Sequence, residues 1–243
     1  MNWIGFWTLI RREVGRFFSV YRQTVLPGLI TSTLYIAIFG FTLEQRISEV
    51  QGVPYTLFIL PGLIMMNTLT NATANTASSM LQMKLLQQLP DLLTAPLSGL
   101  EISLAYIIGG TVRGVVNGLL VLLLGVFLVK LPVMDIFGTI IFIFFVSWAF
   151  SSMGLLLGQL SENWDQLSML QNFVLTPLSF LGGIFYSISM LPDWAQTLSL
   201  INPIYYMING IRYTILGVAD TSVIVSYFMA IALTIIFTIT SIL

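Results

Sequence analysis

Six long stretches with almost no charged residue divide this chain of 243 residues. A helix rises about 1.5 Å per residue, so about 20 apolar residues cross the roughly 30 Å hydrocarbon core of a bilayer. Each stretch therefore predicts a transmembrane helix. We predict an all-α, polytopic membrane protein with six transmembrane helices, in which residues 1–243 form a single domain. The predicted spans are residues 25–43, 54–80, 102–129, 136–160, 167–190 and 223–243.

The composition also requires lipid as a solvent and removes several kinds of chemistry. Hydrophobic residues make up 57% of the chain and charged residues only 8%, which is more apolar surface than a soluble core of this length can bury. The chain has no Cys and no His, so it lacks thiol nucleophiles, the commonest metal ligand and the usual general base. A net charge of -1 gives no basis for nucleic-acid binding. We expect no catalytic, cofactor-binding or metal site in this chain.

The first segment, residues 3–20, has the pattern of an amphipathic helix. Its large apolar residues recur at spacings of three and four, and arginines occupy the other positions of the helical wheel. Such a helix lies on a membrane surface, where it either anchors the first span or docks a cytoplasmic partner. The apolar residues are Trp3, Phe6, Trp7, Ile10, Val14 and Phe17.

Basic residues predict the orientation of the chain. Five of them lie on the side of the N-terminus and three lie in the opposite loops. Loops rich in Lys and Arg stay in the cytoplasm, so the N-terminus is predicted to be cytoplasmic. The five are Arg11, Arg12, Arg16, Arg22 and Lys84, and the three are Arg46, Lys130 and Arg212.

The predicted cytoplasmic loop at residues 82–98 is too regular to be a flexible tether. Short helical patterns lie on either side of Pro90, and a second break follows at Pro96. The loop is either a lever that receives force from a soluble partner or a helical cap on the bundle.

The segment at residues 191–217 is apolar but broken at Pro192 and Pro203. Neither half is long enough to cross a bilayer, and irregular backbone at membrane depth must be packed against protein. We predict outer re-entrant helices here that act as a gate.

Polar side chains inside the predicted spans mark positions that avoid lipid. Arg113 lies in the cytoplasmic half of the third span, where an ionised group costs about 2.5–3.5 kcal/mol. It either extends toward the inner headgroups or pairs with Glu162 or Asp165.

Three asparagines, Asn67, Asn71 and Asn75, recur every four residues along the second span. Residues at this spacing share one helix face. That face either lines a substrate path or forms hydrogen bonds to neighbouring helices, and the sequence leaves both open.

Several other mechanisms lack the residues they need. No predicted span has a carboxylate near its centre, which weakens an ion-coupled carrier. The chain has no G-x-x-x-x-G-K-[ST] phosphate loop, so any ATP must be bound by another polypeptide. A membrane-embedded enzyme would need paired acids, an activated serine or a metal cluster, and none is evident.

The segment LGGIFYSISMLPDWAQTLSLINPIYYMINGIR, at residues 181–212, is the most specific motif in the sequence. Together with FILPGLIMMNTLTNATANTASSM and LTAPLS, it resembles the ABC-2 type integral-membrane permeases of bacterial ABC exporters, in particular their YadH-like members. The resemblance covers nearly the whole chain. Leu191 is at its expected spacing, and the residues assigned by resemblance to the signature and gate are Gly182, Gly183, Pro192, Pro203, Tyr206 and Arg212.

The resemblance implies an exporter permease of the type V kind in the bacterial inner membrane. Such a permease dimerises, and we expect a homodimer in which each copy is seated on a separate cytoplasmic ATPase subunit that binds ATP and Mg. The cargo would be amphipathic; the alternative is an ion-coupled carrier or channel that acts without an ATPase. The helix that couples to the ATPase would cover residues 86–93, through Leu86, Leu89, Asp91, Leu92 and Leu93. From their positions, the path-facing side chains are expected to be Asn67, Asn71, Asn75, Phe173, Thr176 and Phe180.

Overall fold

A computed structural model describes residues 2–40 and 49–242 of the chain. Helices make up nearly all of this part, which confirms the predicted all-α class. The end of the first predicted span, residues 41–43, lies outside the described residues, as do Arg46 and Leu243.

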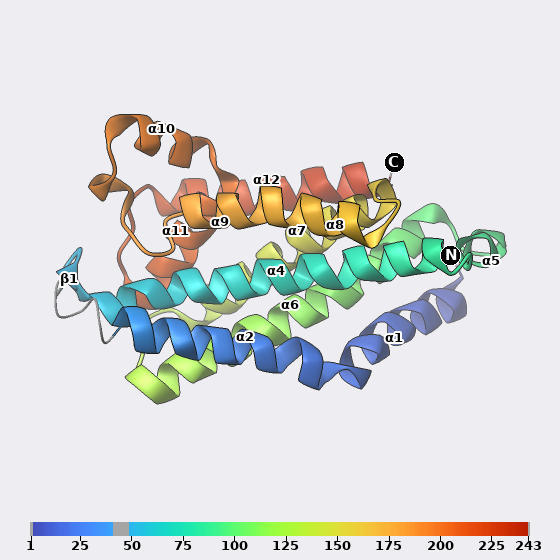
Figure 1. Cartoon of the computed structure of the whole chain (residues 1–243), viewed down its shortest axis with the longest axis horizontal. Coiled ribbons are helices and arrows are strands. Elements are labelled where there is room, and N and C mark those ends of the chain that lie inside the picture. The colour runs from blue at the N-terminus through green and yellow to red at the C-terminus, as the bar shows by residue number, and fades with distance from the viewer. Residues whose placement is uncertain (1, 41–48, 243) are drawn as a thin grey trace.

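Four helices in the described part of the chain are long and apolar enough to cross a membrane. Figure 1 shows them side by side along the long axis of the molecule. The chain is therefore a polytopic helical membrane protein. These helices are α4 (Tyr55–Leu85), α6 (Gly99–Val129), α7 (Ile136–Leu160) and α12 (Val223–Ile242).

Two further helical rods accompany the four long helices. Helix α2 (Tyr21–Tyr35) continues without a break into the π-helix η1 (Ile36–Gly40). The second rod is formed by α8 (Trp164–Leu170), the π-helix η2 (Gln171–Leu175) and α9 (Thr176–Leu181). Both rods run along the bundle in Figure 1, in the places of the first and fifth predicted spans.

The second rod ends nine residues before the predicted limit at residue 190. Two glycines follow Leu181, and Gly183 has a φ of +80°, a left-handed conformation that a residue with a side chain rarely adopts. The chain then turns through the 3-10 helix η3 (Ile188–Met190). The apolar run was long enough for a span, but its glycine pair ends the helix early.

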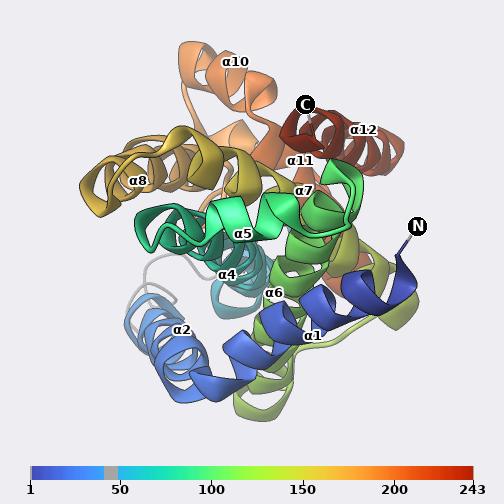
Figure 2. The same ribbon diagram turned by 90° about the vertical axis from the view of Figure 1, so that its right-hand side faces the viewer.

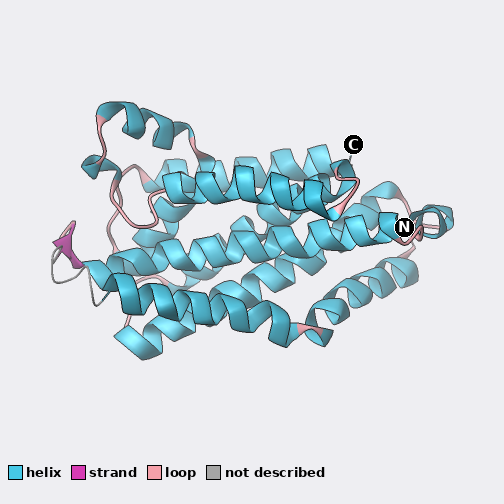
Figure 3. Cartoon of the chain, in the orientation of Figure 1, coloured by secondary structure: helices cyan, strands magenta, loops and turns pink. Residues whose placement is uncertain are grey.

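Short elements cover the two ends of the bundle. At one end lie the hairpin strands β1 (Glu49–Val50) and β2 (Val53–Pro54), with helices α10 (Asp193–Ile201) and α11 (Pro203–Leu216). At the other end lie α1 (Trp3–Ser19) and α5 (Leu89–Thr94). Figure 2 views the molecule from this second end, where α5 crosses in front of α4 and α1 passes beside α6. Figure 3 shows how short the loops between these elements are.

Helices α4, α6 and α7 form the tight centre of the fold. A Cβ atom added to Gly114 of α6 would lie only 2.7 Å from the Oγ of Ser147 in α7. One added to Gly154 of α7 would lie 2.5 Å from the carbonyl oxygen of Thr73 in α4. These small residues let the three backbones approach closely, the packing role that spaced glycines have in membrane helices.

The loop between α4 and α6 differs in detail from the prediction. Helix α4 extends to Leu85, and its end is fixed by Gln87, which has a φ of +54°. Pro90 does not separate two helical pieces; it lies in the first turn of α5, where its missing N–H has no partner to lose. Leu86, expected at the start of the coupling helix, lies in the turn before it.

Candidate transport groove

Helix α4 is buried on most of its surface but leaves one polar strip open. Its neighbours α6 and α7 cover most of its length, so that residues such as Leu69 and Ala72 are fully buried. Asn67, Thr70 and Asn71, spaced by three and one, remain partly or wholly exposed on the uncovered side. A strip of amides and hydroxyls on a central membrane helix needs hydrogen bonds from protein, water or a polar ligand, because lipid cannot supply them.

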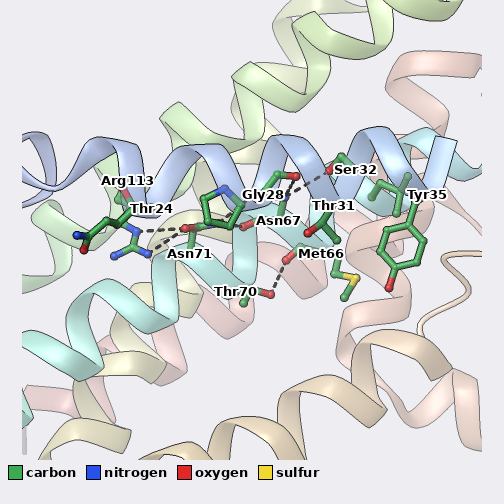
Figure 4. A pocket seen from close by; sticks show the side chains of 13 residues that line it. Thr24, Gly28, Thr31, Ser32, Tyr35, Met66, Asn67, Thr70, Asn71 and Arg113 are labelled. Carbon is green, nitrogen blue, oxygen red and sulfur yellow. Dashed lines mark hydrogen bonds between the residues drawn. The ribbon is translucent and has the colours of Figure 1, made fainter. Parts of the chain in front are cut away.

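A hollow of about 290 Å³ lies over this strip, between α4, α2 and α6. Figure 4 shows its lining side chains, which converge from the three helices. One end is polar and charged, and the other contains an aromatic ring and aliphatic groups. The lining residues are Gln23, Thr24, Pro27, Gly28, Thr31, Ser32, Tyr35, Leu63, Met66, Asn67, Thr70, Asn71 and Arg113.

A chain of hydrogen bonds connects the three helices across the hollow (Figure 4). The Nε and Nη2 of Arg113 in α6 donate to the Oδ1 of Asn71 in α4, at 3.2 and 3.1 Å. The Nδ2 of Asn71 donates to the Oδ1 of Asn67 at 2.9 Å. The Nδ2 of Asn67 then donates to the carbonyl oxygen of Gly28 in α2 at 3.2 Å and to the Oγ of Ser32 at 3.4 Å. Two of the three predicted asparagines therefore hold the site together.

Arg113 has no carboxylate partner among the described residues. The ion pairs in this part of the chain involve other arginines, so the pairing with Glu162 or Asp165 that the sequence left open does not form. The side chain instead extends toward α4 and donates a hydrogen bond to the amide oxygen of Asn71. The arginine and its partner are 42 residues apart in the sequence, and only the packing of α4 on α6 brings them together.

A second, smaller hollow continues along the same strip of α4. It shares Met66 and Thr70 with the first and is closed on its far side by η2 and α9. Together the two hollows form one groove, which we call the α4 groove. The second hollow is lined by Met66, Thr70, Gln171, Asn172, Leu175, Thr176 and Ser179.

Of the three predicted path residues on the second rod, only one lines the groove within the described residues. Thr176 lies in the second hollow. Phe173 is 78% exposed and lines neither hollow, and Phe180 stacks at 5.9 Å on the ring of Phe185 near the end of the rod. The apolar surface of this rod is therefore left open in the single chain.

Asn75 turns away from the groove. It is 1% exposed, and its carbonyl oxygen and Oδ1 accept hydrogen bonds from the Nη2 of Arg16 at 2.7 and 3.2 Å. A four-residue step rotates about 40° beyond one full helical turn, so Asn75 is rotated by about 80° from Asn67. The three regularly spaced asparagines of α4 therefore face two different regions: Asn67 and Asn71 face the groove, and Asn75 faces α1.

Helix α1 is fixed to the bundle through one buried carboxylate, Glu13, which the sequence analysis did not single out. Its Oε1 accepts from Arg12 at 2.8 Å, and its Oε2 accepts from the Oγ of Ser79 at 2.6 Å. The Nε of Arg16 lies 3.7 Å from the same carboxylate, and Arg12 also donates to the OH of Tyr106 at 2.8 Å. Burial lowers the pKa of Arg16 from its ordinary value. Glu13 occupies the same helix face as Phe6, Ile10 and Phe17, a signal that was present in the sequence.

The predicted amphipathic face of α1 divides between protein and surroundings. Phe6, Ile10 and Phe17 are buried, and Phe6 and Ile10 pack in one cluster with residues of α6. Trp3 and Trp7 are more than 60% exposed. The helix thus has one apolar face on the bundle and a second that is free for a membrane surface or a partner.

The predicted coupling residues also face two ways. Leu92 is only 9% exposed and belongs to the apolar cluster that contains Phe6 and Met83. Leu89 packs against the same cluster. Leu86 and Leu93 are exposed at 55% and 65%, and Asp91 is exposed. Helix α5 is therefore anchored by one side while its other side faces outward.

The signature segment surrounds a buried ion pair at the opposite end. Arg212 is fully buried; its Nη1 lies 3.4 Å from the Oδ2 of Asp220, and its Nη2 donates to the carbonyl oxygen of Gly183 at 2.6 Å. The guanidinium also stacks 4.0 Å from the ring centre of Phe58. Asp220 accepts from Ser187 as well. The sequence analysis identified Arg212 but not Asp220, which lies beyond the motif.

The remaining signature residues shape the backbone around this pair. Pro192 precedes the first residue of α10, and Pro203 begins α11, so each proline occupies a helix start. The OH of Tyr206 donates to the carbonyl oxygen of Leu200 at 2.8 Å, which ties α11 to α10. Gly182 lies so close to Ile208 that an added Cβ would be 2.9 Å from its Cδ1.

These features define an integral membrane protein with a polar groove along a central helix and distinct structures at its two ends. The chain belongs to the ABC-2 type transporter family, whose model matches residues 4–216. It is 39% identical to the inner membrane transport permease YadH of Escherichia coli K12, over 93% of this chain and 89% of that protein. It is 28% identical to nodulation protein J of Rhizobium leguminosarum bv. viciae, over 89% of this chain and 83% of that protein.

Proposed function

We propose that this chain is the permease subunit of an ATP-binding cassette exporter and moves an amphipathic molecule along the α4 groove. Membership of the ABC-2 family supports a transport role, and the relative from E. coli is named a transport permease. The groove is the observation that carries the proposal. It places amides and hydroxyls beside apolar groups on the one side of α4 that its neighbours leave open.

In the membrane, the two helical rods complete a set of six spans. The α2 and η1 rod holds 20 residues and the α8, η2 and α9 rod holds 18, lengths of about 30 and 27 Å at 1.5 Å per residue. Helices α10 and α11 then form the re-entrant gate on the outer side. The arginines of α1 put the N-terminus in the cytoplasm of a bacterium, and the location is the inner membrane.

The energy comes from a separate ATPase subunit that binds ATP and Mg. This partner contacts the outward side of α5, where Asp91 and Leu93 are exposed, together with the exposed Leu86 in the turn before the helix. A push on α5 reaches α4 directly, because Leu92 packs with Met83 near the end of α4. Helix α4 runs from this contact to the groove, so a movement at α5 has a continuous helix along which to change the groove.

A second copy of the chain completes the path. The α4 groove is open on the side away from α7, and exposed apolar residues such as Phe173 and Val174 flank it. A homodimer would place two such grooves around one central path. The relative from Rhizobium carries the name of a nodulation protein, and no cargo for this chain follows from that name.

Reconstitution with an ATPase tests the proposal. Candidate ABC ATPase subunits would be co-expressed with the full chain, purified with it and assayed for hydrolysis in lipid nanodiscs. Leu93→Ala is expected to lower permease-stimulated hydrolysis several-fold, since it removes an exposed contact of α5. Leu123→Ala, which trims an exposed leucine of α6 far from α5, is the matched control and should leave hydrolysis unchanged. Failure of every ATPase to associate would overturn the proposal and favour a carrier or channel that acts alone.

A further inference from the structure

We infer that the α4 groove binds the acidic group of its amphipathic ligand on Arg113. This inference rests on the proposed function for its transport role, but the binding itself is a property of this chain alone. The ligand class is a molecule with an anionic head, a carboxylate or a phosphate, and an apolar body. Arg113, Asn71 and Thr24 form the head site, and Tyr35, Leu63 and Met66 form the site for the body.

The charge of the groove favours an anionic ligand. Arg113 is the one ionised side chain among the described residues that line the two hollows. The charged group near enough to act on it is Arg16, another cation. Glu13 is shared between Arg12 and Arg16 and forms no ion pair with Arg113, so in the described part of the chain these three guanidinium groups have one paired carboxylate between them. A cluster with excess positive charge next to a low-dielectric groove attracts anions.

The guanidinium of Arg113 is held in a geometry that leaves donors free. Its Nε and Nη2 both donate to one neutral atom, the Oδ1 of Asn71. The Nη1 has no hydrogen bond within the described residues, yet it is not among the buried unpartnered atoms, unlike the Nε of Arg212. The Nη1 is therefore accessible from outside the protein, and Arg113 lines the hollow. Asn71 holds the planar fork in place and leaves donors free for an oxyanion, the geometry that arginine offers to carboxylates and phosphates.

The first hollow is elongated, with a charged end and an apolar end. Thr24 and Tyr35, both on α2, lie at its two ends in Figure 4, with Arg113 beside Thr24. They are eleven helical steps apart, a length of about 16 Å. The charged end is the one near α1, and the far end is lined by Tyr35 and Leu63. A molecule with an acidic head and a chain of about ten carbon atoms matches this polarity and length.

The test compares two probes with the same apolar body, one of which carries a carboxylate and the other its uncharged methyl ester. Dansyl-labelled undecanoic acid and its methyl ester would be titrated against the full chain in phosphatidylcholine nanodiscs, with empty nanodiscs subtracted. We expect the acid to bind about tenfold more tightly than the ester to the wild type. Arg113→Gln should bring the two affinities together, and Arg113→Lys should retain most of the preference. Lys130→Gln removes the same charge from an exposed site outside the groove and should change nothing.

A second variant keeps the inference testable if Arg113→Gln does not fold. Asn71→Asp places a carboxylate on the guanidinium without changing the size of the side chain, and it should also abolish the preference for the acid. Equal binding of acid and ester by the wild type, or an unchanged preference in both variants, would overturn the inference. Neither result would affect the association with an ATPase, so the two proposals fail separately.

The lipid composition identifies the source of the acidic head. Addition of about 20% phosphatidylglycerol to the nanodiscs supplies an anionic headgroup within the bilayer. Competition with the acid probe would support the site with a membrane lipid as its occupant. Unchanged probe binding would support the site with a separate amphipathic acid as its occupant.

Discussion

Two arginines of this chain, Arg212 on the short helix α11 and Arg113 on the long helix α6, have opposite electrostatic surroundings. Arg212, at the end of the bundle that holds α10 and α11, is fully buried with its own carboxylate, Asp220, and with the carbonyl oxygen of Gly183. Arg113, in the groove, is partly open and holds only the neutral amide of Asn71. The charge of Arg212 is neutralised by a carboxylate inside the protein, and within the described residues the charge of Arg113 is not. The difference separates a structural cation from one that is available to a ligand.

Glu13 on α1 provides the intermediate case. Glu13 forms ion pairs with both Arg12 and Arg16, so one negative charge compensates only part of the two positive charges. If compensation decides the role of each arginine, the free energy of unfolding should respond in the same order. Substitutions at the three sites measure this order directly, and the following predictions run from the largest effect to the smallest.

Removal of Arg212 should be the most damaging change. Arg212→Met leaves Asp220 buried without a cation and the Gly183 carbonyl oxygen without its donor, so we expect the free energy of unfolding to fall by about 3–5 kcal/mol. Titration of the micelle-solubilised chain with dodecyl sulfate, followed by circular dichroism, measures the loss. The double variant Arg212→Met, Asp220→Asn should recover part of it. A double variant as unstable as the single one would show that the ion pair is not the cause.

Removal of the charge at Glu13 should have a smaller effect. Glu13→Gln keeps an oxygen near Arg12 but replaces charged hydrogen bonds by neutral ones, and we expect a loss of about 1.5–3 kcal/mol in the same titration. The control is Glu162→Gln, which removes an exposed carboxylate and should cost less than about 0.5 kcal/mol. Equal effects of the two variants would mean that α1 is held by its apolar face alone.

The positions of the helices could be predicted from the sequence better than the side-chain contacts between them. Helix positions follow from uncharged length and from Pro192 and Pro203, which are local signals. The polar face of α4 was also predicted, and Asn67 and Asn71 do line a hollow. That Asn75 turns to Arg16 depends on where α1 packs, which no local pattern contains.

The side-chain partners of Arg113 and Arg212 could not be predicted for the same reason. The sequence offers Glu162 or Asp165 as a partner for Arg113. The Arg113 side chain instead donates to the amide of Asn71 on the neighbouring helix, 42 residues earlier. Asp220 was missed because it follows the motif that contains Arg212. In both cases the relevant distance is set by helix packing rather than by sequence separation.

Removal of Arg113 should have the smallest effect on stability. Hydrogen bonds between membrane helices contribute about 0.6 kcal/mol each on average, and Arg113→Gln retains an amide that can donate to Asn71. The same change removes a charge that no carboxylate within the described residues offsets, which favours the folded state. These effects oppose each other, so we expect the free energy of unfolding to change by less than about 0.5 kcal/mol in the dodecyl sulfate titration, as for Lys130→Gln. A loss comparable to that of Arg212→Met would place Arg113 among the structural cations. A neutral result would mean that this charge is kept in the membrane for a reason other than folding, as a ligand site requires.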